Sequence, residues 1–508
     1  MGLLLGEMLR LSARRWPRKV AIHDGDRSIT FGAMDRDANR FANALLAQGC
    51  GKGATIAVLC GNRLEYGAVL FGAARTGAVL AHISTRMSED DLAYVLAKSR
   101  ASLLVVEQQL VSRVAAVRNR LQDLKRLVVI DRDYDAFLAG GSDDEPAIKL
   151  SLDDPYGISL TGGTTGRPNM VTFAHSARAM TGIASAFEFG LSEQDVGIVS
   201  TPLFHAAGQV IWFQPLVLVG ATSVFMPRWD VALFIELVER HRATAVFGVP
   251  TQLGDLVRHP KFDPARLKTL RKIDYAAAPM PDALYARLTE AFPDAELREN
   301  YGCTEGGLVT VRRPQFNAAK RGSVGRAVLG LEIGIVDRDG KPLPRRAIGD
   351  VMVRGAASFL HYFGDPEQSA KVKRPDGWVW TGDVGYVDED DFLYLVDRSK
   401  DMVISGGENI YPKEIEDVLY HHAAVAECAV FGIPDERFGE ALACHVVLKT
   451  GAAASPDALI EYAAAKLARH KRIKLMKIVD ALPKTAVGKI QKNVIRDAYW
   501  EGKSRVRL

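Results

Sequence analysis

Short apolar runs separated by amphipathic segments dominate the first part of the chain. Runs rich in β-branched and aliphatic residues occur at Val20 to His23, Thr55 to Leu59, Val79 to His82 and Ser102 to Val106. Between the first two runs, Ala38, Phe41 and Leu45 recur at helical spacing in a segment that ends before Gly49. Strands and helices that alternate in this way predict a layered α/β domain.

The same alternation resumes at Tyr156 and continues to about Val311. The segments after it are short and turn-separated, without a helical pattern between them: Ile333 to Asp337, Gly349 to Val353, Trp378 to Trp380 and Phe392 to Val396. They predict a small β-rich subdomain.

Beyond residue 400 the pattern changes again. Pro412 to His421 is typical of a helix, and Ser455 followed by Pro456 of the capped start of another. Val425 to Phe431 and Leu442 to Leu448 are typical of strands. This region predicts a compact α+β domain.

A charged joint, Asp397-Arg398-Ser399-Lys400, separates the two regions, and a Gly406-Gly407 turn follows it. Such a joint buries few contacts, so the C-terminal domain is expected to move. The prediction is an α/β protein. Its large N-terminal domain, residues 1–397, combines layered α/β subdomains with a small β-rich subdomain. A hinge at 398–400 leads to a mobile small α+β domain over 401–508.

Composition narrows the classes of function. The 508 residues correspond to roughly three structural units of about 150 residues each. With 65 basic and 61 acidic residues, the net charge of +4 is too small for the basic surface of a nucleic-acid binder. Any anionic ligand must therefore be bound locally, and nucleic acid is not an expected partner.

No segment has the pattern of a membrane span or a signal peptide. The most apolar stretch, Val210 to Met226, is interrupted by Gln214, Pro215 and Gly220, whereas a span needs about 20 apolar residues. Near the N-terminus, Leu4, Met8 and Leu11 favour a surface helix. We therefore expect no integral membrane segment.

The cysteines favour a reducing compartment. They form no CxxC pair and have no regular spacing, so neither a zinc site nor a disulfide framework is indicated: Cys50, Cys60, Cys303, Cys428 and Cys444. We expect a cytoplasmic protein.

A Gly/Thr-rich segment, Thr161 to Val171 (TGGTTGRPNMV), follows the apolar strand Tyr156 to Leu160. Its glycines, Gly162, Gly163 and Gly166, allow backbone N–H groups to approach an anion, and Thr164 and Thr165 add hydroxyls for phosphate oxygens or a metal. The segment is not a Walker A loop, because GxxxxGK[ST] is absent. Taken alone, it is more often a hairpin tip.

Three further candidates are weak when taken singly. The segment Asn300 to Glu305 (NYGCTE) adds oxygen ligands that suit Mg²⁺. Asp383 on its own is more often a turn-capping acid than a ribose ligand. Lys489, which follows Gly488, would ordinarily be solvated surface.

The order of these elements along nearly the whole chain resembles the adenylate-forming superfamily, which includes acyl-CoA synthetases, luciferases and peptide-synthetase adenylation domains. The run Ser405 to Pro412 (SGGENIYP) is most similar to fatty-acyl-CoA and aryl-CoA ligases. The resemblance implies a two-step reaction. A carboxylate attacks the α-phosphate of Mg-ATP to give acyl-AMP and pyrophosphate, and the thiol of coenzyme A then displaces AMP.

The resemblance also implies roles for individual residues. Thr161 to Gly166 would hold the phosphates, including Gly162, Gly163, Thr164 and Thr165, and Glu305 with Thr164 would hold Mg²⁺. Adenine would lie against Ala276, Ala277, Ala278, Pro279, Asn300 and Tyr301, with Gly302 and Thr304 in the same motif and Asp383 and Arg398 at the ribose. Lys489 would reach the carboxylate and α-phosphate and would act in catalysis with Glu305 and Thr165. Lys400 would be the hinge residue, and Gly406 and Gly407 would border the pantetheine channel.

The expected acyl pocket is small and mostly apolar, with these candidate residues: His205, Ala206, Gly208, Gln209, Phe213, Tyr275 and Cys303. Relatives often read GGAP where this chain has Ala276 to Pro279, and two added methyl groups should narrow the pocket. No residue here is an obvious partner for a second substrate charge. The expected substrate is therefore a medium-chain, alicyclic or aromatic monocarboxylate.

Departures from the family pattern leave alternatives open. The loop of the family usually reads TSGTTGxPKG, whereas here Gly162 replaces Ser, Asn169 replaces Lys and Met170 replaces Gly. Because Asn169 lacks the positive charge, weaker ATP use is expected, and a catalytically weak nucleotide-binding protein is one alternative. The other is an adenylating enzyme that loads a carrier-protein phosphopantetheine. A homodimer is also left open.

Overall fold

The computed structural model describes residues 2–161, 167–278, 280–398, 401–405, 408–484 and 490–501, with only the backbone at Arg398 and Asn409. The chain divides into two compact units. Residues 1–333 and 353–379 form the first, and residues 334–352 and 380–508 form the second.

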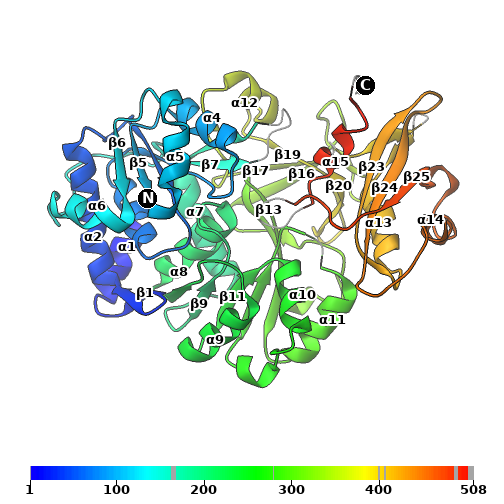
Figure 1. The fold of residues 1–508 in the computed structure, drawn as a ribbon, viewed down its shortest axis with the longest axis horizontal. Coiled ribbons are helices and arrows are strands. Elements are labelled where there is room, and N and C mark those ends of the chain that lie inside the picture. Colours follow the sequence, from blue (N-terminus) through cyan, green and yellow to red (C-terminus); the bar gives the residue numbers. More distant parts are fainter. Residues whose placement is uncertain are drawn as a thin grey trace. The chain divides into compact units, whose positions relative to one another are not determined.

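Among the described residues, nine strands of the first unit form one sheet in the order β15-β14-β13-β12-β11-β9-β10-β1-β2, and Figure 1 labels β1, β9, β11 and β13 of this sheet. Their bounds are β1 (Val20–Asp24), β2 (Arg27–Thr30), β9 (Val196–Val199), β10 (Thr222–Phe225), β11 (Ala245–Gly248), β12 (Lys272–Tyr275), β13 (Glu296–Cys303), β14 (Gly307–Arg312) and β15 (Arg326–Ala327). The central strands from β1 to β13 pair in parallel. One face packs against α9 (Val231–His241), α10 (Pro250–Arg258) and α11 (Asp282–Ala291). Because both faces of such a sheet are covered, the central strands β9 to β12 are buried at almost every position.

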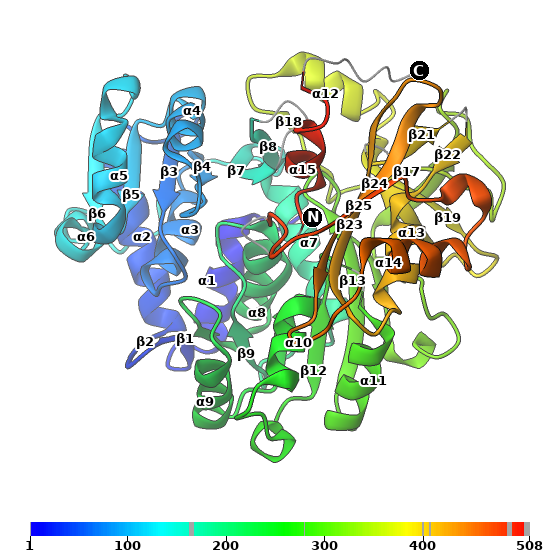
Figure 2. The same ribbon diagram turned by 45° about the vertical axis from the view of Figure 1, so that its right-hand side comes forward.

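A second sheet of the first unit has the order β18-β8-β7-β4-β3-β5-β6 in the part of the chain that the structure describes. Its strands are β3 (Thr55–Leu59), β4 (Val79–His82), β5 (Leu103–Val106), β6 (Arg126–Val129), β7 (Pro155–Thr161), β8 (Asn169–Ala174) and β18 (His361–Tyr362). The apolar faces of α4 (Glu89–Ser99) and α5 (Val111–Ala116) cover it on one side (Figure 2). Strands β3 and β4 match the predicted ranges residue for residue.

A layer of helices packs together beside these sheets, with many contacts between its members. It contains α1 (Leu5–Arg15), α2 (Phe31–Ala47), α3 (Glu65–Ala73), α6 (Ile130–Ala139), α7 (His175–Glu188) and α8 (Gln214–Val219). Thr30 caps α2 because its side chain accepts the Ala33 N–H at 3.2 Å. The helix predicted before Gly49 is confirmed, and Gly49 has the left-handed φ of 74° expected after a helix end.

One helix was missed in the sequence, in the region expected to lack helices. α12 (Pro366–Val372) follows β18, and Asp365 caps it by accepting the Gln368 N–H at 3.0 Å. It has seven residues, none of them fully buried. Because it buries no apolar stripe, hydrophobic periodicity could not reveal it; the Asp-Pro start was the available signal.

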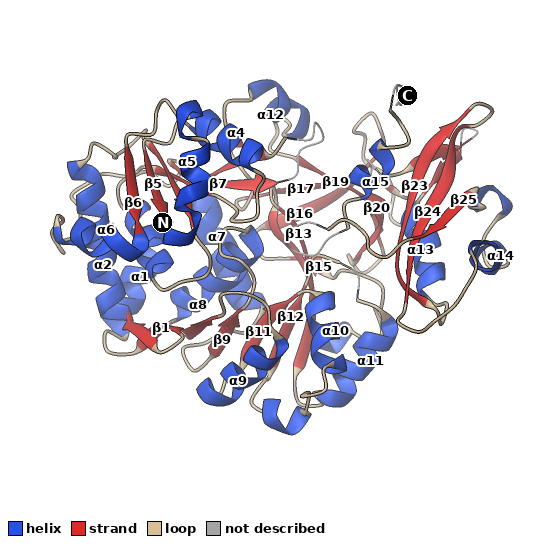
Figure 3. Ribbon diagram, viewed as in Figure 1, coloured by secondary structure: helices blue, strands red, loops and turns tan. Residues whose placement is uncertain are grey.

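The second unit contains most of a sheet of order β16-β17-β19-β20, made of β16 (Leu331–Val336), β17 (Gly349–Gly355), β19 (Val379–Val387) and β20 (Leu393–Arg398). A further sheet joins β22 (Glu408–Ile410), β21 (Val403–Ser405), β24 (Gly439–Leu448) and β23 (Val425–Asp435), with β25 (Leu475–Ile478) beside β24. Figure 3 shows α13 (Pro412–Tyr420) along β23, and their apolar faces share a core with α14 (Pro456–Ala464). The predicted cap is present, since Ser455 accepts the Ala458 N–H at 3.2 Å.

Short elements complete the described chain: the π-helix η3 (Ala207–Phe213), the 3-10 turns η1 (Gln108–Leu110), η2 (Arg118–Arg120), η4 (Pro264–Leu267), η5 (Pro314–Phe316) and η6 (Arg469–Lys471), and α15 (Lys492–Asp497). Across the described residues, no helix has the length and apolar character needed to cross a bilayer. All five cysteines are free thiols.

Candidate functional site

The predicted phosphate segment lies between the antiparallel strands β7 and β8 of the seven-stranded sheet, in which β18 is the edge strand beside β8. Strand β7 ends at Thr161 and β8 begins at Asn169, and these two residues are paired. The strand that enters the segment was predicted. Residues 162–166, which include Gly162, Gly163, Thr164, Thr165 and Gly166, lie outside the described residues, so their roles stay predictions.

Arg167, which follows the segment, is engaged with a neighbouring helix. Its guanidinium carbon lies 5.2 Å from the centre of the Tyr94 ring, and its Nη1 lies 3.8 Å from Asp91 Oδ1. Both partners belong to α4. Arg167 is therefore held toward this helix, and we do not expect it to replace the charge missing at Asn169.

The loop after β12 carries an unusual backbone conformation. Ala277 has φ of 78°, in the left-handed region that disfavours residues with a Cβ. Relatives that read GGAP have glycine there, so the sequence departure puts a methyl group where the backbone favours none. Pro279 lies outside the described residues. Tyr275 is fully buried, and its hydroxyl lies 3.3 Å from Arg312 Nη2 and 3.4 Å from Glu299 Oε2.

Strand β13 and the turn after it bring the NYGCTE residues to the carboxyl end of the nine-stranded sheet. Asn300 is 3% exposed, and its side-chain amide lies against the buried carboxyl of Asp274, whose pKa it lowers. Glu305 is half-buried, and its Oε1 accepts the Tyr362 hydroxyl at 2.7 Å. An oriented carboxylate suits a hard cation, so Glu305 fits the predicted Mg²⁺.

Five of the predicted acyl-pocket residues, His205, Ala206, Gly208, Gln209 and Phe213, lie on or just before the π-helix η3, a distortion often found at functional sites. Tyr275 and Cys303 end strands β12 and β13. His205 Nδ1 accepts the Ala207 N–H at 3.2 Å. Gly208 is required by packing, because a Cβ there would approach the carbonyl oxygen of Pro202 to 2.4 Å. Phe213 is fully buried, whereas Cys303 is partly exposed.

Gln209 lies over a buried histidine that sequence reasoning missed. Its Nε2 is 2.9 Å from His82 Nε2, and Tyr66 oxygen is 2.7 Å from His82 Nδ1. The Tyr66 hydroxyl donates to the Leu203 carbonyl at 3.0 Å, so the network favours a proton on His82 Nδ1. Burial lowers the pKa of His82 to about 3, which keeps it neutral. The signal available in the sequence was a histidine ending an apolar strand.

The predicted ribose residues belong to the second unit. Asp383 on β19 pairs directly with Arg398 on β20, so the structure brings these two positions together. The Asp383 N–H donates to Thr381 Oγ1 at 3.1 Å, and Asp383 is buried. Lys400, Gly406, Gly407 and Lys489 lie outside the described residues.

Comparison with known proteins decides the family. Residues 9–363 match the profile described as AMP-binding enzyme, and residues 414–489 match the AMP-binding enzyme C-terminal domain. The chain belongs to this family. The predicted class, an AMP-forming acid–thiol ligase, and the predicted set of ATP, Mg²⁺ and coenzyme A are confirmed for the family.

This chain is similar to ligases whose names give different acyl acceptors and different carboxylic acids. It is 34% identical to feruloyl-CoA synthase of Amycolatopsis sp, over 96% of this chain and 97% of that protein. It is 31% identical to the fatty acid–[acyl-carrier-protein] ligase ScoC of Streptomyces coeruleorubidus, over 97% of this chain and 96% of that protein. The structure of the anthranilate CoA ligase AuaEII with anthranoyl-AMP superposes with a TM-score of 0.90 at 28% identity, and the match covers 99% of this chain and 98% of that one. These matches also confirm the predicted fold class.

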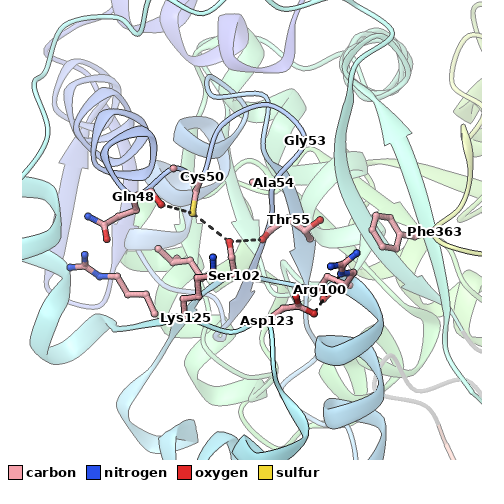
Figure 4. A pocket seen from close by; sticks show the side chains of 14 residues that line it. Gln48, Cys50, Gly53, Ala54, Thr55, Arg100, Ser102, Asp123, Lys125 and Phe363 are labelled. Carbon is pink, nitrogen blue, oxygen red and sulfur yellow. Dashed lines mark hydrogen bonds and ion pairs between the residues drawn. The ribbon is translucent and has the colours of Figure 1, made fainter.

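A surface pocket of this protein lies elsewhere. Its volume is about 720 Å³, and it opens at the amino ends of β3 and β5, where Thr55 and Ser102 line it (Figure 4). Ser102 Oγ lies 3.5 Å from Cys50 Sγ, and Arg100 Nε lies 3.6 Å from Asp123 Oδ2. The predicted site residues of the first unit instead follow the carboxyl ends of strands, where α/β enzymes bind ligands. The pocket is therefore separate from the candidate site.

The charge missing at Asn169 gives a direct test. Asn169→Lys is expected to tighten ATP binding or to speed adenylation about tenfold, because a hydrogen bond to a charged group contributes about 1.5–3 kcal/mol. Calorimetric titration with ATP and initial rates of pyrophosphate exchange measure the effect, with Asn169→Gln as the uncharged control. Equal affinity and rate in both variants and the parent would show that the charge is not needed.

Behind the nucleotide residues, a buried carboxyl makes stability depend on pH. Burial raises the pKa of Asp274 to about 7, although Arg298, whose Nη1 lies 3.8 Å away, opposes the shift. The folded state then holds a proton that the unfolded chain loses near pH 4. Stability should therefore fall as pH rises from about 4 to about 7, by up to about 4 kcal/mol.

Asp274→Asn should remove this dependence. The free energy of unfolding of the variant, relative to that of the parent protein, is expected to be higher at pH 8 than at pH 5. Urea unfolding of both proteins at the two pH values measures this difference. The matched control is Asp294→Asn, at an exposed aspartate before β13. Parallel pH profiles for the parent and the Asp274 variant would contradict the assignment.

Proposed function

We propose that this protein ligates a monocarboxylic acid to coenzyme A at the expense of ATP. The acid attacks the α-phosphorus, forming acyl-AMP and releasing pyrophosphate; the thiol then attacks the acyl carbon, and AMP leaves. The observation that carries the proposal is the Glu305 carboxylate, oriented by Tyr362 at the carboxyl end of the nine-stranded sheet.

The residues of this chain would divide the work of binding. Asn300 and Ala276 to Ala278 would face adenine, while Thr161 and the segment after it would hold phosphates. Glu305, with Thr164, would hold Mg²⁺, which supplies charge neutralisation on the phosphate oxygens. Asp383 and Arg398, paired on adjacent strands, would bind the ribose. Gly406 and Gly407 would border the pantetheine.

The acid is proposed to be compact: aromatic, alicyclic or of medium chain length. Ala276 and Ala277 place methyl groups in the loop after β12, where relatives often have glycine, and Phe213 and Gln209 are packed in the core. The similar feruloyl-CoA synthase and anthranilate ligase carry names of aromatic acids. A panel of acids tested for CoA-dependent AMP release would overturn this class if only dicarboxylates or amino acids reacted.

Acid-dependent exchange of pyrophosphate into ATP tests the first step without knowledge of the acceptor. The protein should catalyse exchange with at least one compact monocarboxylate and none without acid. No exchange with any acid of a broad pool would favour the catalytically weak nucleotide-binding alternative, motivated by Asn169.

A carrier-protein phosphopantetheine is the second candidate acceptor, supported by the similarity to the carrier-protein ligase ScoC. Both acceptors present the same thiol. Thioester formation with free coenzyme A and with a loaded carrier protein, compared at equal concentrations, decides between them.

Three further points belong to the proposal. The C-terminal domain, residues 401–508, turns about a hinge at 398–400 with Lys400 as its pivot. The protein acts in the cytoplasm, in keeping with its five free thiols. Sedimentation of the purified protein would test a homodimer.

A further inference from the structure

A tyrosine remote in sequence contacts the carboxylate of Glu305. Tyr362, on β18, is 57 residues away, and its hydroxyl donates to Glu305 Oε1 at 2.7 Å. Tyr362 is 5% exposed, and the centre of its ring lies 5.1 Å from that of the fully buried Phe359. Packing therefore fixes the phenol, and the phenol fixes one oxygen of the carboxylate.

Tyr362 is a neutral donor to this carboxylate, which matters for charge. The phenol of tyrosine has an ordinary pKa of about 10, so the Tyr362 hydroxyl keeps its proton at neutral pH. The nearby Lys373 donates instead to the carbonyl oxygen of Phe359, at 2.6 Å. A phenol orients a carboxylate but leaves its negative charge in place, whereas a lysine or an arginine would neutralise that charge.

The backbone around Tyr362 joins Glu305 to the strand that leaves the phosphate segment. The Phe359 N–H donates to the Glu305 carbonyl oxygen at 2.8 Å. The Leu360 N–H donates to the Thr172 carbonyl at 2.8 Å, and the Phe363 N–H to the Met170 carbonyl at 2.7 Å. Residues 359–363 thus hold Glu305 and β8 in a fixed relation. β8 begins three residues after the phosphate segment at 162–166.

We propose that Tyr362 is a positioning residue that orients Glu305 toward a divalent cation on ATP. The inference rests on the proposed role of Glu305. Partners that orient metal ligands typically contribute about 10–100-fold to metal affinity. A purely structural tyrosine would affect folding stability and leave the metal requirement unchanged.

The test is Tyr362→Phe in the full chain, which removes one oxygen and keeps the ring. The probe is Mn²⁺ with α,β-methylene-ATP, which cannot be cleaved at the α-phosphate, and free Mn²⁺ is measured by electron paramagnetic resonance. The dissociation constant of Mn²⁺ is expected to rise about tenfold. The Mg²⁺ concentration for half-maximal pyrophosphate exchange should rise in parallel. An unchanged dissociation constant overturns the proposal.

The matched control is Tyr134→Phe. Tyr134 is also 5% exposed, and its hydroxyl lies 3.5 Å from a backbone carbonyl of Glu65. This variant should keep the parent dissociation constant, and an equal rise in both variants overturns the proposal. Absence of acid-dependent exchange in the parent protein would refute the proposed function itself, and the reason for this inference with it.

Two further variants make the test specific. In a Glu305→Gln background, Tyr362→Phe should weaken Mn²⁺ binding no further, because the phenol acts through the carboxylate; an additive loss overturns the proposal. If Tyr362→Phe does not fold, Ser369→Ala replaces it. Ser369 Oγ accepts the Tyr362 N–H at 2.9 Å, so its loss loosens the tyrosine and should raise the dissociation constant in the same direction. An unchanged Mn²⁺ dissociation constant in Ser369→Ala overturns the proposal.

Discussion

Lys489→Ala is expected to lower the rate of acyl-adenylate formation about 10²–10³-fold, the usual scale for removing one donor aimed at a developing charge. Negative charge grows on the phosphate oxygens in the transition state, and a lysine carried by a mobile domain acts there selectively. Thioester formation from supplied acyl-AMP should largely survive. Single-turnover kinetics of the two half-reactions measure the difference.

Lys449→Ala is the control for this prediction, because Lys449 is an exposed lysine of the same unit. Its loss should leave both half-reactions at parent rates. Equal losses in the two half-reactions of Lys489→Ala would contradict the proposed turning of the C-terminal domain between the two steps, since the lysine would then serve both steps.

Lys492→Met is expected to destabilise the second unit by about 3–5 kcal/mol, because it leaves a buried carboxylate unpaired. Lys492 Nζ lies 2.7 Å from Glu416 Oε1, and the same oxygen accepts the Val430 N–H at 2.6 Å. Burial opposes the charge of Lys492, but attraction to Glu416, Asp397 and Asp401 outweighs it and raises the pKa of Lys492. This ion pair ties α15 to α13.

Urea unfolding followed by the fluorescence of Trp500, whose indole donates to the Gly432 carbonyl at 3.0 Å, measures the loss. The control is Lys471→Met, whose lysine pairs with the exposed Glu414 at 2.6 Å, and it should cost less than about 1 kcal/mol. Replacing both buried partners, in Glu416→Leu with Lys492→Met, should recover much of the stability. A double variant as unstable as Lys492→Met would count against an unpaired charge as the cause.

Much of the fold could be read along the chain because its determinants are local. The apolar runs at Thr55 to Leu59 and Val79 to His82 are strands with those bounds, and Ser455 caps the helix expected after it. Periodicity failed at α12, which buries no apolar face. Periodicity also does not predict the left-handed backbone conformation of Ala277.

The candidate site divides in the same way. Its motifs, from Thr161 to Lys489, and the family that they indicate follow from residue types and their order along the chain, so no coordinates were needed to find them. The pairing of Tyr362 with Glu305, the neutral His82 below Gln209 and the buried Asp274 depend on strands that meet only in the folded protein. Hydrogen bonding and burial act through space, and one-dimensional spacing carries no information about neighbours that are 57 residues apart.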